Sequence, residues 1–345
     1  MKVAILTPTF CKFSGPDMVA ENEAEERTAK GDEVTVFAFK GDIQPKNYKV
    51  KYLGMPKNST LERAYRLFFF LDILKIMKTA KMLQEYDETV SFLYPMTIIA
   101  ATANKYYHKR YIYYNVGVAY PKLFESLTER IYMKLFNTFT NFTVKNADQA
   151  ISISNFLREE LKRETGLEST VKYVKVNAKE YNKNIGREKA EGVIRRHNLT
   201  KPILLYVGRL SPHKGAHLLL EAFEKIAASF PTATLVITGK PTFDKYSKKL
   251  NKASEKINKS GKGKVIFTGF VPDEELPHYF AACDLYTTAT LWEGFDIPAV
   301  HAQMCGKKVV AFEVGSHPEV VKEGILVKEG DINGFAEATI KLLKN

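Results

Sequence analysis

Two cations, Arg209 and Lys214, stand between a strand-like run and a helix-like stretch. The strand candidate covers residues 203–207, Gly208 permits a tight turn after it, and a helical pattern starts at His217. In open α/β sheets, ligands bind just beyond the carboxyl ends of strands, and a helix N-terminus there attracts anions. Arg209 can form two parallel hydrogen bonds to phosphate oxygens, and Lys214 adds a compact charge. The spacing predicts a phosphate site, with a solvated surface loop as the equal alternative.

A second segment with chemical potential covers residues 293–306, which begin Glu-Gly-Phe-Asp-Ile-Pro. It indicates a loop that leads into a short helix, with Asp296 as its cap and Pro298 in its first turn. We expect the amides of Phe295 and Ile297 to point outward at the helix start. Alone, the segment is typical of an ordinary capped helix. Together with the first cluster, it predicts a second wall of a diphosphate site.

The elements that must position these residues alternate between short apolar runs and longer amphipathic stretches. The strand candidates are 3–6, 34–39, 90–93, 111–114 and 150–153 in the first half, and 203–207, 234–238, 265–268, 284–288 and 308–312 in the second. Such continuous apolar runs are typical of parallel strands covered on both faces. Strand–helix alternation through both halves predicts two doubly wound α/β domains. The polar segment 177–186 separates them, so the predicted domains are 1–177 and 178–345.

Composition narrows the choice of partners and compartment. A chain of 345 residues with 45% hydrophobic residues can form two ordinary cores. Its formal net charge of +12 favours anionic partners. No motif of the common nucleic-acid-binding modules occurs, so a nucleic-acid partner is not expected. The three scattered cysteines form no C-x-x-C motif and indicate a reducing, cytoplasmic setting.

Four segments of the second half, VGRLSPHKG, TGFVPDEELPHYFAACDLY, EGFDIPAVHAQMCGKKVVAF and GSHPEVV, resemble the donor-binding half of glycosyltransferase family 4. In the first half, TPTFCKFSGPDMV and AKGDEVTVF resemble the first strand, glycine loop and second strand of that family. The likeness covers essentially the whole chain. It implies the GT-B fold, in which two Rossmann-like domains face a cleft. The N-terminal domain would bind the acceptor, and the C-terminal domain would bind a nucleotide-sugar donor.

The resemblance also implies roles for single residues. Arg209 and Lys214 would hold the donor diphosphate and stabilise the leaving phosphate, and Glu293 would bind the transferred sugar. The donor-binding positions would be Gly15, Gly208, Val271, Gly294, Phe295, Asp296, Ile297 and His301, with Gly15 over the diphosphate and Val271 near the base. The implied reaction is a retaining transfer of a hexose, such as mannose or glucose, from a GDP- or UDP-sugar. No D-x-D motif occurs, so phosphate binding requires no metal or other cofactor.

Three positions depart from the family pattern. His301 stands where the family has a glutamate that binds ribose, and either a rearranged ribose contact or simple packing on its helix explains it. Asn115 aligns with a histidine beside the sugar and is a candidate sugar contact. Many relatives continue beyond the position of Asn345 into a helix that crosses back, and without that helix domain closure would be less tethered. These departures leave two alternatives, a non-catalytic nucleotide-sugar-binding relative and a GT-B nucleotide-sugar epimerase.

The acceptor and the membrane are the remaining partners to consider. A hydroxyl of a saccharide or of a lipid-linked glycan is the expected acceptor. Residues 61–83 mix aromatic and aliphatic residues with five cations, as a basic amphipathic helix on an anionic membrane does. A Rossmann helix against its sheet shows the same pattern, and we favour that interpretation. The expected location is therefore the cytoplasm, with peripheral contact at the inner membrane face as the alternative.

Overall fold

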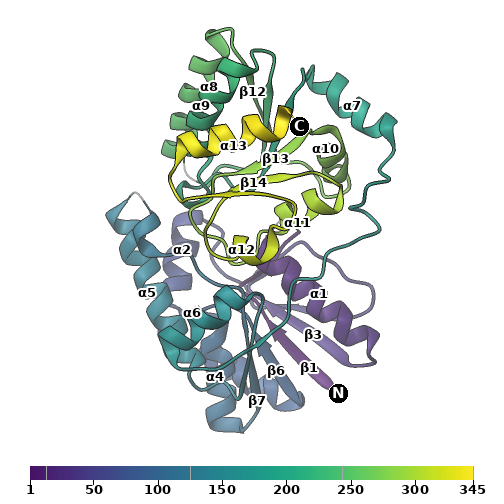
Figure 1. Ribbon diagram of the computed structural model, residues 1–345. Helices are drawn as coiled ribbons and strands as arrows, with labels where there is room; N and C mark the ends of the chain where they lie inside the picture. The colour runs from purple at the N-terminus through teal and green to yellow at the C-terminus, as the bar shows by residue number, and fades with distance from the viewer. Residues whose placement is uncertain (13, 125, 243, 345) are drawn as a thin grey trace. The chain divides into compact units, whose positions relative to one another are not determined.

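The computed structural model describes residues 1–12, 14–124, 126–242 and 244–344. The chain forms two compact units (Figure 1). Unit 1 comprises Met1–Lys122 and Ser126–Lys175, and unit 2 comprises Leu123–Glu125 and Val176–Asn345. Each unit is built around a parallel sheet with helices packed against it (Figure 1).

The main sheet of unit 1 has the strand order β5-β3-β1-β6-β7-β8-β9. Its strands are β1 (Lys2–Leu6), β3 (Glu33–Ala38), β5 (Lys49–Tyr52), β6 (Glu88–Ser91), β7 (Arg110–Asn115), β8 (Gln149–Ser152) and β9 (Thr170–Val171), and β2 (Thr9–Phe10) pairs with β4 (Lys40–Gly41). The helices are α1 (Gly15–Ala29), α2 (Ser59–Leu67), η1 (Phe69–Leu71), α3 (Ile73–Met82), η2 (Leu83–Glu85), α4 (Met96–Tyr107), η3 (Pro121–Leu123), α5 (Leu127–Val144) and α6 (Asn155–Thr165).

The sheet of unit 2 has the strand order β12-β11-β10-β13-β14-β15. Its strands are β10 (Ile203–Val207), β11 (Thr234–Thr238), β12 (Lys264–Gly269), β13 (Leu285–Thr288), β14 (Val309–Phe312) and β15 (Gly324–Val327). The helices are α7 (Arg187–His197), η4 (Pro212–Lys214), α8 (Ala216–Ser229), α9 (Asp244–Lys259), α10 (Leu276–Ala282), α11 (Ile297–Met304), α12 (His317–Val320) and α13 (Ile332–Lys344).

In each unit the first strand lies inside the sheet, and the chain builds outward from it in two directions. In unit 2, β11 and β12 lie on one side of β10, whereas β13, β14 and β15 lie on the other. The neighbouring strands of both main sheets are parallel, so the carboxyl ends of the strands share one edge. The strand order therefore reverses between β10 and β13, and between β1 and β6. A reversal of this kind is where doubly wound sheets bind ligands.

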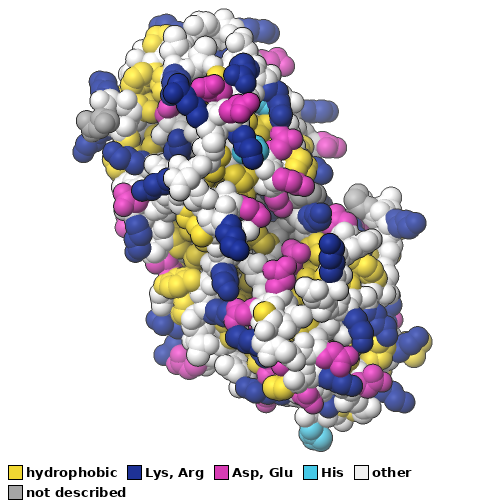
Figure 2. Space-filling model, turned by 90° about the vertical axis from the view of Figure 1, so that its right-hand side faces the viewer, with side chains coloured by type: hydrophobic (Ala, Val, Ile, Leu, Met, Phe, Trp, Pro, Cys, Tyr) yellow, Lys and Arg dark blue, Asp and Glu magenta, His cyan; other side chains and the backbone are white. Residues whose placement is uncertain are grey.

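The ten strands that the apolar runs predict are all present. Most of these runs are buried, as all five residues of β11 are, whereas β8 and β12 are in large part half-buried. The prediction lacks the edge strands β5 and β15 and the short strands β2 and β4. β5 has the sequence KVKY, whose lysines are typical of an edge strand, and β15 begins with a glycine. Figure 2 shows that Lys and Arg side chains spread over the face drawn, with Asp and Glu among them. On that face the cations form no single stripe of the kind that nucleic-acid-binding proteins present.

The prediction of one amphipathic helix over 61–83 is wrong. The segment forms α2 and α3, with η1 between them. The break occurs at Asp72, whose Oδ1 accepts a hydrogen bond from the Lys75 amide at 3.1 Å and caps α3. Asp72 Oδ2 also accepts from the Tyr65 hydroxyl at 2.9 Å, so the cap is held from the preceding helix. Within the described residues, no helix combines the length and the apolar character needed to cross a bilayer.

Candidate active site

The loops that follow β10 and β13 are joined at the reversal point of the unit 2 sheet. The amide of Leu291 donates to the His213 carbonyl oxygen at 2.8 Å, and the Thr290 hydroxyl donates to the same oxygen at 3.1 Å. Since β10 and β13 are paired neighbours, both loops leave the sheet at the same edge. The structure thus brings together the two segments that the sequence singles out, although they lie far apart along the chain.

Gly215 fixes how closely the two loops approach. It has a φ of +67°, and a Cβ atom there would lie 1.7 Å from the carbonyl oxygen of Ala289. Gly208 is similarly enclosed, because its carbonyl oxygen lies only 1.9 Å from where a Cβ of Gly239 would be. The glycines at the ends of neighbouring strands therefore let backbone lie on backbone. This contact holds Lys214, directly before Gly215, over the end of β13.

Lys214 and Glu293 form a salt bridge across the two loops. Their side chains are only 19% and 12% exposed. Burial raises the pKa of Glu293 above its ordinary value, and the neighbouring ammonium group of Lys214 opposes that shift. A largely buried carboxylate and ammonium group at the reversal point provide one hydrogen-bond acceptor and one cation for a ligand.

Asp296 caps α11 and is itself held by His317. Asp296 Oδ1 accepts from the Ala299 amide at 3.0 Å, and Oδ2 lies 3.0 Å from His317 Nε2. His317 Nδ1 lies 2.6 Å from the Phe312 carbonyl oxygen, which can only accept a hydrogen bond. Both ring nitrogens therefore donate, and His317 is an imidazolium ion paired with the Asp296 carboxylate.

The pKa values of this buried pair agree with the hydrogen-bond geometry. Burial alone lowers the pKa of His317, but the hydrogen bond to Asp296 and its charge raise that pKa above its ordinary value. Burial alone raises the pKa of Asp296, and the hydrogen bond and charge of His317 bring it below its ordinary value. His317 belongs to the GSHPEVV segment, which the resemblance left without a role. A histidine beside a helix-starting proline is the only sequence signal of its function.

The same segment also supports the backbone of Glu293. The Ser316 amide donates to the Glu293 carbonyl oxygen at 3.0 Å. A Cβ at Gly315, where φ is +55°, would lie 2.2 Å from that oxygen. The chain after β14 therefore packs under both acidic residues of the Glu-Gly-Phe-Asp segment.

The loop after β10 carries two cations, Arg209 and Lys214, of which Lys214 is paired with Glu293. The Arg209 side chain is exposed, and no described carboxylate forms a salt bridge with it. His213, which is buried, has its pKa lowered to about 2 by burial first and then by the charges of Lys214 and Arg209. His213 is therefore neutral and adds no charge to the two cations of the loop.

Several predicted site residues have surroundings that the sequence did not indicate. The amide of Ile297 donates to the Phe295 carbonyl oxygen at 3.0 Å, so the expectation that it points outward is wrong. His301 is 7% exposed and stacks on the Tyr181 ring, with 3.5 Å between centroids. Val271 is buried in the core beside β12.

In unit 1, the Asn115 side chain, a predicted sugar contact, is buried and makes hydrogen bonds within the unit. Asn115 Nδ2 donates to Ser152 Oγ at 3.2 Å and to the Leu157 carbonyl oxygen at 3.0 Å. Its Oδ1 accepts from the Gly117 amide at 3.1 Å. Asn115 therefore fixes the end of β7 with an amide that is already satisfied. Gly15 is exposed at the start of α1, and a Cβ there would meet open space.

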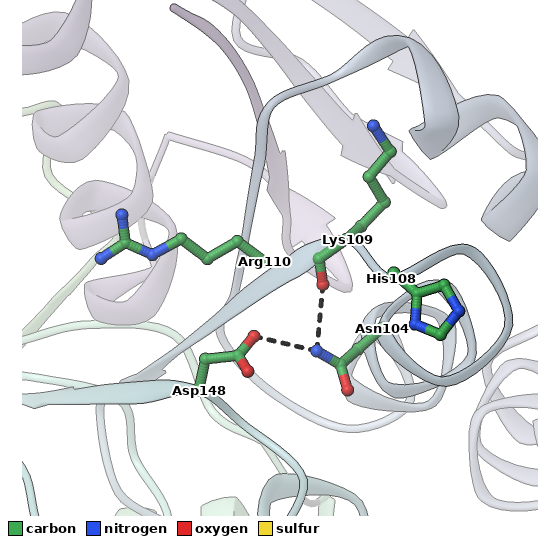
Figure 3. A pocket seen from close by; sticks show the side chains of 5 residues that line it. All are labelled: Asn104, His108, Lys109, Arg110 and Asp148. Carbon is green, nitrogen blue, oxygen red and sulfur yellow. Dashed lines mark hydrogen bonds between the residues drawn. The ribbon is translucent and has the colours of Figure 1, made fainter.

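A pocket of about 440 Å³ in unit 1 lies at the opposite end of the strands (Figure 3). It is lined by Asn104, His108, Lys109, Arg110 and Asp148, which lie where β7 and β8 begin. Asn104 Nδ2 donates to the Lys109 carbonyl oxygen at 3.0 Å and to Asp148 Oδ2 at 2.9 Å (Figure 3). These hydrogen bonds tie the end of α4 to the starts of β7 and β8.

A model of the family described as glycosyl transferases group 1 matches residues 189–345. The matched range makes up just under half of the chain, and it is similar to this family. The site residues of unit 2 all lie within the matched range, apart from Tyr181. The range that resembles this family therefore contains Arg209, Lys214, Glu293 and the Asp296–His317 pair.

Curated relatives resemble part of the chain. The chain is 27% identical over 210 residues to the phosphatidylinositol N-acetylglucosaminyltransferase GPI3 subunit of Saccharomyces cerevisiae. This alignment covers 60% of this chain and 45% of the yeast protein. It is 28% identical over 146 residues to the O-antigen chain mannosyltransferase B of Escherichia coli, which covers 41% of this chain and 36% of that protein. The match thus spans less than half the length of these relatives.

Solved structures resemble the whole chain. Sucrose-phosphate synthase from Thermosynechococcus elongatus has a TM-score of 0.80 at 19% identity and covers 100% of this chain and 90% of its own. Anabaena HepE in complex with UDP and glucose has a TM-score of 0.74 at 21% identity, and the match covers 99% of this chain and 89% of the HepE chain. The chain accordingly has the GT-B type of fold, with two Rossmann-like domains.

Proposed function

We propose that the protein is a glycosyltransferase of family 4 that moves a hexose from a UDP- or GDP-sugar to a hydroxyl of a saccharide or lipid-linked glycan. The observation that supports this most directly is the Lys214–Glu293 salt bridge at the reversal point, with Arg209 on the same loop. Cations for a diphosphate and a carboxylate for sugar hydroxyls meet there. Unit 2 would bind the donor, and unit 1 would bind the acceptor.

Donor binding exchanges the partners of the salt bridge. The diphosphate takes the ammonium group of Lys214 and the guanidinium group of Arg209, and the Glu293 carboxylate then accepts hydrogen bonds from the sugar. In a largely buried site these charges act more strongly than in water. His317 keeps Asp296 ionised and in place, so the loop from Gly294 to Ile297 stays fixed against the sugar and phosphates.

In the transfer step, the bond between the anomeric carbon and the phosphate oxygen breaks, and the acceptor oxygen bonds to that carbon from the same face. The leaving phosphate oxygen takes the acceptor proton, so the anomeric configuration is retained. Lys214 and Arg209 stabilise the negative charge that develops on the diphosphate. No metal or other cofactor is required for that role.

The remaining contacts are proposed on the basis of position. Val271 follows β12 at the same edge and would lie near the base, and Gly208 would let the diphosphate approach the end of β10. His301 would reach the ribose only with the edge of its ring, because Tyr181 covers one face. Gly15 would cover the diphosphate from the exposed start of α1.

The relatives support the choice of substrates. The structures of HepE were solved with UDP, with UDP and glucose, and with UDP-glucose, which supports a uridine donor. The yeast relative is named for phosphatidylinositol and the bacterial one for O-antigen chains, which supports a glycan or lipid-linked acceptor. We accordingly propose a cytoplasmic enzyme that contacts an anionic membrane.

A thermal-shift titration with UDP, GDP, ADP and their hexose conjugates tests the donor. A ligand that binds only the folded protein at about 100 times its Kd stabilises it by roughly 2.7 kcal/mol. We expect one nucleotide family to give this shift, and the anomeric configuration of a transferred sugar, read by NMR, to match that of the donor. Binding without transfer or donor hydrolysis would instead favour a non-catalytic relative, and epimerised donor would favour an epimerase.

A further inference from the structure

We propose that one face of unit 1, formed by α2, the turn from Phe68 to Leu74, α3 and α5, docks on an anionic lipid bilayer. We call this surface the docking face. It deepens the proposed function, on which it rests for the lipid-linked acceptor, but its binding to lipid can be measured without any sugar transfer.

The large hydrophobic side chains that the protein exposes gather on this part of unit 1. Of the fourteen that are exposed among the described residues, ten lie on α2, the turn, α3 or α5: Leu61, Phe68, Leu71, Ile73, Leu74, Met77, Leu127, Ile131, Leu135 and Phe142. Leu74 is 86% exposed and Phe142 is 74% exposed. Contiguous exposed apolar residues are rare on soluble proteins and mark interaction sites.

Helix α5 has its more apolar side turned away from the core. Its buried stripe is half polar and consists of Phe136, Thr140, Thr143 and Val144. The opposite stripe is exposed, and at helical spacing it consists of Leu127, Ile131, Leu135 and Phe142. A helix that only needed to cover the sheet would bury the second stripe. This inverted pattern indicates that an apolar medium meets α5 from outside.

The turn and α5 form one continuous surface. The Phe70 ring lies 4.9 Å from the Phe139 ring of α5, measured between centroids. Phe139 borders the exposed stripe, one turn from Leu135, and α2 lies beside α5 (Figure 1). The exposed side chains of Phe68 and Leu71 flank Phe70 in sequence. Ring packing thus joins the two groups of exposed hydrophobic residues.

The net charge of these elements favours an anionic bilayer as the apolar medium. Residues 59–82 and 127–145 contain eight cations and three anions. Within the described chain, no carboxylate forms a salt bridge with Lys78, Lys81, Lys134 or Lys145, all of which are exposed. Each Lys or Arg near an anionic bilayer contributes about 1 kcal/mol to binding. Apolar side chains with cations beside them match the headgroup and acyl regions of such a bilayer.

A second copy of the chain is a poorer occupant of the docking face. Two docking faces in contact would bring the lysines and arginines of these elements close to those of the second copy, with few anions between them. Like charges at an interface oppose association, whereas anionic lipids neutralise the same cations. The charge balance therefore favours lipid over self-association.

Flotation with vesicles tests this proposal. Vesicles of phosphatidylcholine alone are compared with vesicles of equal parts phosphatidylcholine and phosphatidylglycerol. We expect the full chain to float with the anionic vesicles only, and to be released by high salt. Leu71→Glu with Leu74→Glu, and Ile131→Glu with Leu135→Glu, should each lower the partition coefficient by about tenfold or more.

Tyr106→Glu is the matched control, because Tyr106 is an exposed aromatic residue of unit 1 at the end of α4, outside the docking face. It adds the same kind of charge and should leave flotation unchanged. Unfolding midpoints of all variants should equal that of the parent, since the replaced side chains are exposed.

The proposal is overturned if the protein floats with neither vesicle, or with both equally, or if Tyr106→Glu weakens binding as much as the docking-face variants do. A dimer in sedimentation velocity that Leu71→Glu with Leu74→Glu dissociates, in a protein that does not float, would assign the face to a second copy. Thermal shifts with nucleotides, measured without vesicles, should be unaffected by every docking-face variant. If only flotation fails, the docking face is refuted and the proposed donor site is not affected. If only nucleotide binding fails, the donor site is refuted and the docking face is not affected.

Discussion

The two units have the same kind of reversal in strand order, yet they use their surfaces in opposite ways. Every large hydrophobic residue that the described chain exposes belongs to unit 1, and unit 2 exposes none of its described ones. Both units bury some charged groups, but unit 2 gathers Lys214, Glu293, Asp296 and His317 beyond the carboxyl ends of its strands. One scaffold thus supports a polar site inside one unit and an apolar face outside the other.

The difference shows which parts of a doubly wound fold are free to acquire function. The strands of both units are buried apolar runs that only position the loops and helices after them. In unit 2 the proposed donor site lies in loops at the carboxyl edge, where glycines allow backbones to touch. In unit 1 the outer sides of α3 and α5 are not needed for the core, so they can be apolar without loss of fold.

The largest expected effect on unit 2 comes from His317→Leu. This change leaves the Asp296 carboxylate, which is 4% exposed, without its cationic partner. Breaking a buried ion pair in this way should lower the free energy of unfolding by about 3–5 kcal/mol. Urea unfolding measures it, and the double variant with Asp296→Asn should recover a large part of the loss. A loss below about 1 kcal/mol would mean that the pair is not ionised.

Gly215→Ala should have the next largest effect, and Gly54→Ala in unit 1 is its control. Both glycines have positive φ, but only Gly215 would bring a Cβ against another backbone. A positive φ at an alanine alone lowers the free energy of unfolding by about 1–2 kcal/mol. We expect Gly54→Ala to lose no more than this amount, and Gly215→Ala to lose more. Gly215→Ala should also weaken nucleotide binding, as the loops must separate. Equal unfolding energies for the two variants would contradict the close approach.

A smaller effect is expected for His301→Phe, which keeps a ring on Tyr181 and removes both nitrogens. If the edge of His301 contacts ribose, UDP or GDP should bind with an affinity lower by about 1 kcal/mol, or roughly fivefold. Pyrophosphate, which has no ribose, should bind as it does to the parent. Calorimetry with both ligands makes the distinction, and unchanged nucleotide affinity would leave His301 with a packing role alone.

The smallest expected effect is on the pH dependence of the free energy of unfolding. This dependence is compared between the parent and the Asp296→Asn, His317→Leu double variant. The raised pKa of His317 gives stability that is complete below its ordinary value of 6.5 and is lost as pH rises through the folded value. The lowered pKa of Asp296 gives stability that is complete above 3.8 and is lost as pH falls through the folded value. The difference between the proteins should therefore be greatest between pH 3.8 and 6.5. A difference that grows above the ordinary histidine pKa would contradict the imidazolium assignment.

Residue order alone predicts the strands and the two loops of the site, because buried runs and glycine–cation spacing are local features. It does not reveal His317, whose role depends on a contact with Asp296 across 21 positions. Nor does it show that Asn115 is satisfied by Ser152 and Leu157, which are remote in sequence. The helix break at 68–72 depends on a cap that Tyr65 holds, so apolar periodicity alone cannot locate it.

Nucleotide binding to Lys214→Ala tests the donor site most directly, with Lys262→Ala as control. Lys262 is an exposed lysine of unit 2 just before β12, at the opposite edge of the sheet. A charge-assisted contact contributes about 1.5–3 kcal/mol, so calorimetry should show UDP or GDP affinity lower by roughly tenfold to a hundredfold in Lys214→Ala. The control should bind as the parent does. Parental affinity in Lys214→Ala, or an equal loss in Lys262→Ala, would contradict a donor site between β10 and β13.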